Sequence, residues 1–181
     1  MESNEKRMRA LQESMLVGHC AESRTAIHNS GGNMAKIMAT FWYYIRECTR
    51  KDYPTLPMLR TLFSGGVTEP YGGFIDKQGE VVPLKRMVFY GTSRCQFTTT
   101  AYNIYQCWLR HESELVVRMA DHSHLHIDCF EHSQLVLHVE SSTCKAVVKL
   151  YGNAKLTTSG HAECITVQRM GMETYEQKTE Q

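Results

Sequence analysis

The chain has 181 residues and a mass of 20.8 kDa, a length that fits one domain, or one domain with a small appendage. Its hydrophobic content of 42% and charged content of 22% are typical of a globular protein and exclude a disordered or collagen-like chain. The formal net charge of +1 is too small for the strong field that attracts nucleic acid or acidic membranes, so neither is an expected partner.

The seven cysteines are odd in number and contain no Cys-x-x-Cys pair. A disulfide framework or a zinc ribbon needs paired, closely spaced sulfur atoms, so this pattern indicates reduced thiols. Charged residues such as Glu2, Glu5 and Arg7 interrupt the stretch where a signal peptide needs an apolar run, and no run of about 18 apolar residues follows. We therefore expect an intracellular, cytoplasmic protein.

Residues 1–66 are predicted to form a helical region. From Asn33 to Cys48 apolar residues recur at the i, i+3, i+4 spacing of an amphipathic helix, and Asn33 is a suitable N-cap. A weaker helical period covers residues 4–17. A short helix is predicted over residues 55–63, because a proline in its first turn and glycines after its end are typical helix boundaries.

The helical period ends after this region. Residues 71–82 (YGGFIDKQGEVV) contain two short extended pieces around a turn-like centre, which predicts a β-hairpin within a linker of residues 67–89. At the other end of the chain, residues 170–181 are too polar to form a core. A disordered tail is predicted there.

Residues 90–169 repeat about every ten residues. Each unit begins with a turn and continues with the alternation of apolar and polar residues that is typical of a half-buried strand. One slot of each turn holds a small or polar residue: Ser93, Asn103, Ser113, Ser123, Ser133, Thr143 and Ala154. The sixth unit has one extra residue near Cys144 to Ala146, which we expect to form a β-bulge.

Two folds satisfy a unit of turn plus strand. In a parallel β-solenoid, two units form one coil of about twenty residues, so Val116 lies beside Val136. In an antiparallel meander or sandwich, consecutive units pair through tight hairpins. Turns such as Asp121-His122-Ser123 lack the glycine that tight hairpins favour, so the sequence favours the solenoid. The predicted fold class is α+β, with N-terminal helices capping one end of a C-terminal repetitive β-solenoid.

A family resemblance rests on several sequence motifs. They are DYPTLPMLRTLF (52–63), YGGFIDKQGEVV (71–82), AYNIYQCWLRHESELVVRM (101–119), FEHSQLVLHV (130–139) and LYGNAKLTTSG (150–160). These motifs resemble small uncharacterised proteins encoded by phages and prophages of gut Bacteroidota, which join a short helical part to a repetitive β-solenoid. The resemblance covers residues 33–165. It implies a solenoid fold, a viral origin and a place in the host cell, and it assigns no catalytic residue.

A histidine cluster is the strongest candidate for metal chemistry. His124, His126 and Asp128 are alternate residues of one predicted strand, so they face outward together at a spacing that metal sites use. The neighbouring strand would place Gln106 and Trp108 beside them, and these do not complete a ligand set. A solvated polar face is the other interpretation, and no metal or cofactor is assigned.

Catalytic patterns are weak in this sequence. Asp121-His122-Ser123 and Glu131-His132-Ser133 contain an acid, a base and a nucleophile, but consecutive residues of a turn point in different directions and do not align as a triad. The sequence has no nucleophile elbow, P-loop or dinucleotide-binding motif. We therefore expect a protein that is not an enzyme, and a metal-dependent enzyme is the third hypothesis.

Outward positions of the predicted strands carry the candidate binding residues. Val116 and Val136 form an exposed apolar strip, which favours a homo-oligomer such as a trimer. Three basic or titratable residues border the strip and can hold an anionic small ligand: Arg118, His138 and Lys155. Further outward candidates for contact with a partner are Trp108, His124 and His126.

The leading functional hypothesis combines these observations with the resemblance. It is a non-enzymatic, phage-type binding protein that sequesters or inhibits a host factor or a small signalling molecule and so counters host antiviral defence. A rigid ladder fixes side chains in rows, which lowers the ordering cost of binding a host protein or an anionic small molecule. The alternative is a structural or assembly component of a virion.

Overall fold

The computed structural model describes Lys6, Arg9 and residues 21–175. These residues divide into two compact units, one reaching Tyr71 and including Tyr175, the other spanning Gly72–Thr174. Each unit is described by itself. In the described part of the chain, no helix is both long and apolar enough to cross a membrane.

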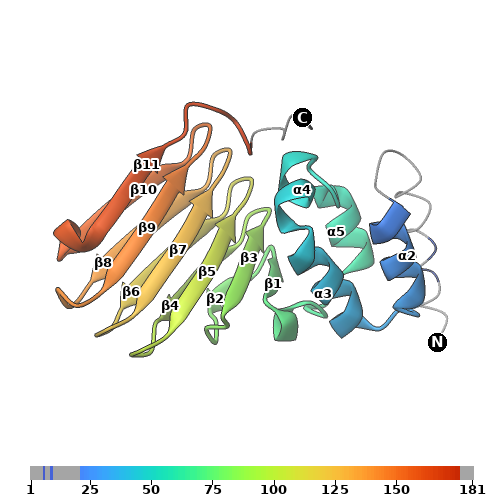
Figure 1. Cartoon of the computed structure of the whole chain (residues 1–181), viewed down its shortest axis with the longest axis horizontal. Coiled ribbons are helices and arrows are strands. Elements are labelled where there is room, and N and C mark those ends of the chain that lie inside the picture. The colour runs from blue at the N-terminus through green and yellow to red at the C-terminus, as the bar shows by residue number, and fades with distance from the viewer. Residues whose placement is uncertain (1–5, 7–8, 10–20, 176–181) are drawn as a thin grey trace. The chain divides into compact units, whose positions relative to one another are not determined.

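Short helices form the first unit (Figure 1). They are α2 (Ala21–Asn29), α3 (Met34–Tyr43), α4 (Ile45–Arg50), α5 (Leu56–Leu62) and the 3-10 helix η1 (Glu69–Tyr71). The helix predicted from Asn33 is present as α3 and α4, which meet at Tyr44. The Asn33 side chain caps α3 as predicted, since its Oδ1 accepts a hydrogen bond from the Lys36 backbone N–H at 3.2 Å. Apart from Lys6 and Arg9, the predicted helix at residues 4–17 lies outside the described residues.

Eleven strands form the described solenoid unit (Figure 1). They are β1 (Gly73–Ile75), β2 (Gln78–Glu80), β3 (Arg86–Tyr90), β4 (Arg94–Thr98), β5 (Ile104–Leu109), β6 (Glu114–Met119), β7 (His124–Cys129), β8 (Gln134–Val139), β9 (Lys145–Leu150), β10 (Lys155–Gly160) and β11 (Ile165–Arg169). A second 3-10 helix, η2 (Ala162–Cys164), precedes β11. Consecutive strands alternate between two sheets, ordered β1-β3-β5-β7-β9-β11 and β10-β8-β6-β4-β2.

All of these sheet pairs are parallel. The offset is the predicted twenty residues for β3–β5, β4–β6, β5–β7 and β6–β8, and it lies between 15 and 21 residues for the other pairs. Leu115 pairs with Leu135, and Val116 pairs with Val136. The predicted class is confirmed as α+β, with N-terminal helices followed by a C-terminal β-solenoid. The antiparallel meander is excluded, because its consecutive strands would pair with each other, whereas here strands that are consecutive in the chain belong to different sheets.

The hairpin predicted at residues 71–82 is wrong. Its two extended pieces are β1 and β2, which lie in different sheets and pair in parallel with β3 and β4. The solenoid therefore begins at Gly73, inside the predicted linker, and not at residue 90. Two short strands around a turn have the same local sequence pattern in a hairpin, where they pair with each other, and in a solenoid, where each pairs with the next coil. The sequence around the turn therefore does not distinguish a hairpin from a solenoid coil.

The extra residue of the sixth unit lies in a turn and not in a strand bulge. β9 is an uninterrupted strand, and Cys144, not Thr143, occupies the small slot with 1% exposure. Its Sγ donates to the Ala120 carbonyl oxygen at 2.9 Å, the same acceptor that Ser123 Oγ uses at 2.6 Å. The turn absorbs the insertion, so the inward and outward faces of β9 are preserved and the offset between β7 and β9 becomes 21 residues.

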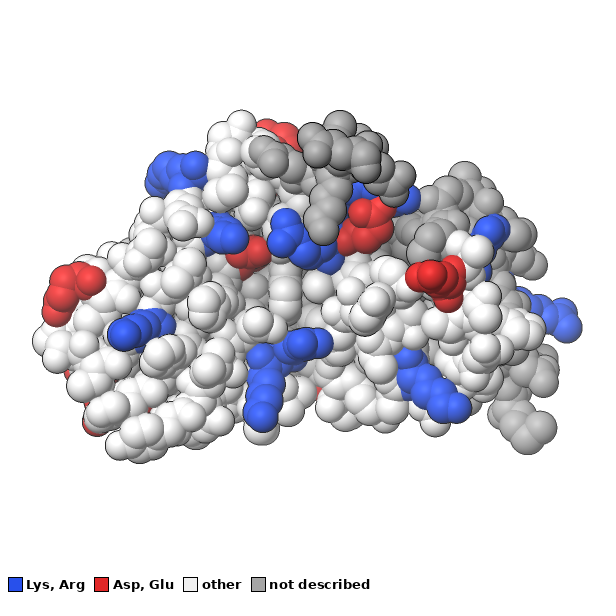
Figure 2. Space-filling view, in the orientation of Figure 1, with Lys and Arg blue, Asp and Glu red and all other residues white. Residues whose placement is uncertain are grey.

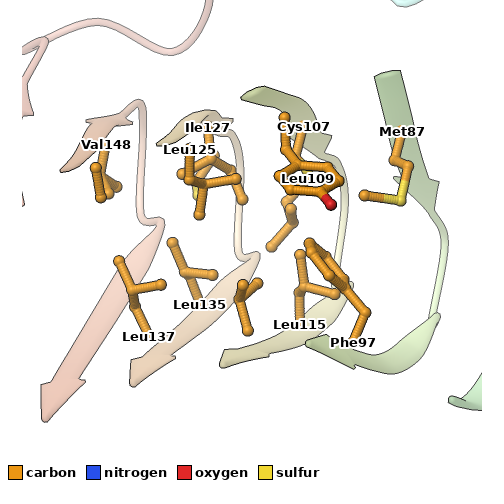
Figure 3. Packing of buried hydrophobic residues seen from close by; sticks show 14 of the residues in the cluster. Met87, Phe97, Cys107, Leu109, Leu115, Leu125, Ile127, Leu135, Leu137 and Val148 are labelled. Carbon is orange, nitrogen blue, oxygen red and sulfur yellow. The ribbon is translucent and has the colours of Figure 1, made fainter. Parts of the chain in front are cut away.

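The core of the solenoid lies between its two sheets. Figure 3 shows Leu135 and Leu137 of β8 pointing toward the sheet that carries Leu125 and Ile127, and these four residues are at most 1% exposed. The cysteines at inward positions are core residues, as predicted. Burial alone raises the pKa of the Cys107 thiol, which keeps it protonated and inert.

Part of the predicted tail is ordered. Met172 accepts a hydrogen bond through its carbonyl oxygen from the Gly152 N–H at 2.9 Å. Tyr175 is 7% exposed, and the Arg46 guanidinium lies 4.6 Å from the centre of its ring. The prediction of disorder is therefore wrong for residues 170–175. Residues 176–181 lie outside the described residues.

Gly160 ends β10 in a conformation that requires glycine. Its φ is +78°, and a Cβ at this position would overlap the backbone of Val139. We expect Gly160→Ala to lower the free energy of unfolding by about 2 kcal/mol or more, through left-handed strain and the backbone clash together. Urea unfolding monitored by circular dichroism measures this loss.

The matched control is Gly171→Ala, where φ is +63° but no atom lies within 4 Å of the added Cβ, so the cost should be about 1 kcal/mol. Equal losses would contradict the packing argument.

Candidate binding face

The outward side chains of β4, β6, β8 and β10 form a face with three parallel rows, here called the β6–β8 face. Alternation within each strand sends the core residues inward and these residues outward. The rows are Arg94, Glu114, Gln134 and Lys155; Gln96, Val116, Val136 and Thr157; and Thr98, Arg118, His138 and Ser159. Because β6 and β8 are paired on both sides, the side chains at the centre of the face are held on a rigid support.

The middle row is a short apolar strip. Val116 and Val136 are in register, as predicted, and Val136 is 38% exposed. The neighbours of this pair within the row are the polar residues Gln96 and Thr157. The strip is therefore two valines long, which makes it a small apolar contact within a polar face.

Arg118, His138 and Ser159 lie in register on β6, β8 and β10, three neighbouring strands of one sheet that are spaced about 4.8 Å apart. The Nδ1 atom of His138 lies 2.7 Å from the Ser159 Oγ. When this hydroxyl donates to Nδ1, the ring proton is on Nε2, which then serves as a donor for a ligand. The row contains no carboxylate, and among the described residues the Arg118 guanidinium forms no hydrogen bond or ion pair. Guanidinium, imidazole and hydroxyl groups in one row are suited to a phosphate or a carboxylate.

Lys155 lies on the other side of the valine strip. It is in register with Gln134, in the same row as the Arg94–Glu114 ion pair of 3.4 Å. The three predicted anion-binding residues therefore border the strip as expected, but Lys155 is separated from the other two by the middle row. An anion at Arg118 and His138 does not need Lys155.

The remaining predicted contact residues lie on the other sheet. Trp108 of β5 is in register with Asp128, and His126 of β7 is in register with Gln106. His124 pairs with Ile104, which is 59% exposed. The structure thus separates the predicted set into two groups on two sheets, and of the predicted anion-binding residues Arg118 and His138 share one row, on the β6–β8 face.

The predicted histidine cluster does not bring three ligand atoms together. His124, His126 and Asp128 face outward from β7 as expected, beside Gln106 and Trp108. Within the described solenoid, residues 72–174, no three His, Cys, Asp or Glu side chains bring ligand atoms within 4.8 Å of one another. On the adjacent strand β9, Lys145 and Lys149 are in register with His124 and Asp128, and these positive neighbours oppose a bound cation.

The acid-base-nucleophile turns do not form triads. The Asp121 carboxylate lies 3.0 Å from His122 Nδ1, but Ser123 is buried and its Oγ donates to the Ala120 carbonyl oxygen. Hydrogen bonds from the Thr143 and Ser141 hydroxyls, with His122 nearby, lower the pKa of Asp121. The carboxylate therefore stabilises the turn, as predicted.

An exposed aromatic stack was not predicted from the sequence. Tyr102 is 80% exposed, and its ring centre lies 4.9 Å from that of His122 in the next coil. Both residues have left-handed φ angles, +60° and +53°. The twenty-residue offset brings these two turn positions together, so the repeat contained the signal for this pair.

Charge is distributed sparsely over the face of the molecule that Figure 2 shows. On the visible, described surface in Figure 2, Lys and Arg side chains stand singly or in small groups between uncharged areas. This visible surface therefore offers a few local charged groups and not a broad field of one sign.

Comparisons of the chain with protein family models, with curated proteins and with solved structures find no match. The relation to phage proteins stays a prediction from the sequence motifs. The functional argument therefore rests on the geometry of the solenoid.

Proposed function

We propose that this chain is a non-enzymatic binding protein that holds an anionic partner on the β6–β8 face. The observation that carries the proposal is the row of Arg118, His138 and Ser159, in which a guanidinium that has no partner among the described residues lies in register with a hydrogen-bonded imidazole. The paired strands beneath the row fix the spacing of these groups before binding, so little ordering entropy is lost. The site binds its ligand without converting it chemically.

The partner of this row is a small anionic signalling molecule of the host, such as a phosphate-bearing nucleotide. A row of donors matches phosphate oxygens, and the short valine strip beside it can contact an apolar part of the same ligand. Sequestration of such a molecule by a phage-type protein in the host cytoplasm would counter antiviral defence. This role is supported by the sequence motifs, and the binding chemistry by the geometry of the row.

Native mass spectrometry of the full chain, purified directly from a host lysate, tests the proposal. We expect a retained anionic ligand, and binding of at least one member of a panel of nucleoside monophosphates, cyclic mononucleotides and cyclic dinucleotides. Arg118→Gln should weaken that binding about tenfold to a hundredfold, because a hydrogen bond to a charged group contributes about 1.5–3 kcal/mol. Arg94→Gln is the matched control on the same face and should change binding less than threefold.

The outcomes are distinct. A protein that carries no anionic ligand and binds none of the panel contradicts the proposed function. Binding that survives Arg118→Gln unchanged, or that is lost equally in Arg94→Gln, contradicts the proposed site.

A further inference from the structure

The C-terminal end of the solenoid has an incompletely covered core. Val167 of β11 is 45% exposed, whereas Val148, its in-register neighbour in the preceding coil, is 0% exposed. On the other sheet Leu156 of β10 is partly exposed, whereas its neighbour Leu135 is 0% exposed. These inward positions of the last coil have core residues below them, and among the described strands none lies above.

In the same coil, some backbone hydrogen-bonding groups of β10 and β11 face no other described strand. In β10 the Lys155 N–H donates to Ser133, and the next N–H beyond the strand, that of His161, donates to Val139. Alternate residues of a strand direct their N–H and C=O groups to opposite sides. Leu156 and Thr158 therefore direct these groups to the open edge. By the same alternation, with Met170 donating to Leu150, the backbone of Val167 faces the open edge of β11.

We propose that a second copy of this chain pairs with this end in a two-fold symmetric dimer, in which β10 of each copy pairs with β11 of the other. β10 and β11 run in opposite directions, because a turn joins them across the two sheets. A two-fold axis parallel to the strands exchanges the sheets and keeps the strand directions. It therefore places β10 antiparallel to the partner's β11, and the reverse contact follows by symmetry.

The positions of β10 and β11 along the solenoid axis also fit this arrangement. β11 lies half a coil beyond β10, about 2.4 Å along the solenoid if neighbouring coils are about 4.8 Å apart. When β10 pairs with the partner's β11, the two strand pairs across the interface have equal separations. If β10 paired with the partner's β10 and β11 with the partner's β11, one of the two pairs would be too far apart for hydrogen bonds. A single strand from another protein would cover one edge only, so a second copy fits this end better.

The contact is small, and the dimer is expected to be weak. An end about 20 Å long, the length of a six-residue strand, and roughly 20 Å wide buries about 800 Å² in both copies together. Stable complexes bury about 1,200 Å² or more, so we expect dissociation in the micromolar range or above. Antiparallel pairing also places Lys155 near the partner's Arg169. Added salt screens this repulsion and should therefore strengthen the dimer.

Sedimentation equilibrium of the full chain over a range of concentrations tests the proposal. We expect a monomer–dimer equilibrium that shifts toward dimer in about 0.5 M salt. The screening length is about 10 Å at 0.1 M salt and is shorter at this higher concentration, so the repulsion between Lys155 and Arg169 is weakened. Val167→Lys places a charge between the two cores and should weaken association at least tenfold. Thr166→Lys, the adjacent outward position of β11, is the matched control and should change it less than threefold. A chain that stays monomeric at millimolar concentration overturns the proposal, as do equal effects of the two lysines.

Hydrogen exchange distinguishes this end from the valine strip. Raising the concentration should slow exchange at the amides of Leu156, Thr158 and Val167, which face the open edge. The amides of Thr157 and Thr166 already face the preceding coil, so their exchange should not change. Protection without this alternation, or a dimer that Val136→Lys abolishes and Val167→Lys leaves intact, overturns the proposed pairing without bearing on the ligand site.

Discussion

Replacing Leu135 by alanine is expected to lower the free energy of unfolding of the solenoid by about 3 kcal/mol, within the range of about 2–5 kcal/mol for buried leucines. Leu135 is 0% exposed and lies between the two sheets, so truncation removes apolar burial and leaves a cavity that parallel strands cannot collapse around. Urea unfolding monitored by circular dichroism measures the loss. Val136→Ala, one residue along the same strand, is the control and should cost less than about 1 kcal/mol because its side chain faces solvent. Similar losses at both positions would show that the alternation of β8 is wrong.

Replacing Glu131 by glutamine is expected to cost about 3 kcal/mol at neutral pH, as when one partner of a buried ion pair is removed. The Glu131 carboxylate accepts hydrogen bonds from Arg110 Nε at 3.1 Å and Nη2 at 2.6 Å, and from the backbone N–H of His111. Arg110 is only 4% exposed. The substitution removes one charge that compensates this buried guanidinium, so keeping the Arg110 cation in the folded state costs more free energy.

The cost of Glu131→Gln should depend on pH. Burial alone would raise the pKa of Glu131, but the hydrogen bonds and charge of Arg110, with the His111 N–H, hold it below its ordinary value of 4.5. The stabilisation is therefore fully present above about pH 4.5 and is lost as the pH falls through the lower pKa of the folded state. Unfolding of wild type and Glu131→Gln between pH 7 and pH 3 should show a difference that shrinks below pH 4.5. Glu112→Gln, an exposed acid of the preceding coil, should show little difference at any pH, and a constant gap at Glu131 would contradict the ion-pair explanation.

The solenoid was predictable because its sequence pattern is periodic. Leu115 and Leu135 share the same slot in units twenty residues apart, and the parallel pairing follows directly from this spacing. The same offset predicted that Val116 lies beside Val136. The contact of His138 with Ser159 needed the offset of 21 residues, which depends on the placement of the one extra residue.

Other features were not predictable from local pattern. β1 and β2 resemble a hairpin in sequence, and only their pairing with β3 and β4 shows that they begin the solenoid. The Arg110–Glu131 pair joins neighbouring coils at a turn, where no alternation marks which side chains meet. Tyr102 adopts a left-handed φ that propensity assigns to glycine or asparagine, so its conformation could not be inferred from residue type.

The turn that holds the extra residue has a consequence for how such a chain can vary over evolutionary time. Residues 140–144 gain one position over the turn at 120–123, yet Cys144 donates to the same carbonyl oxygen as Ser123, that of Ala120, and β9 enters the core in phase. An insertion or deletion in a turn thus leaves the inward and outward side chains of the next strand unchanged, whereas the same change inside a strand would exchange buried and solvent-exposed side chains. The outline of each coil can diversify while the stacked interior is inherited unchanged.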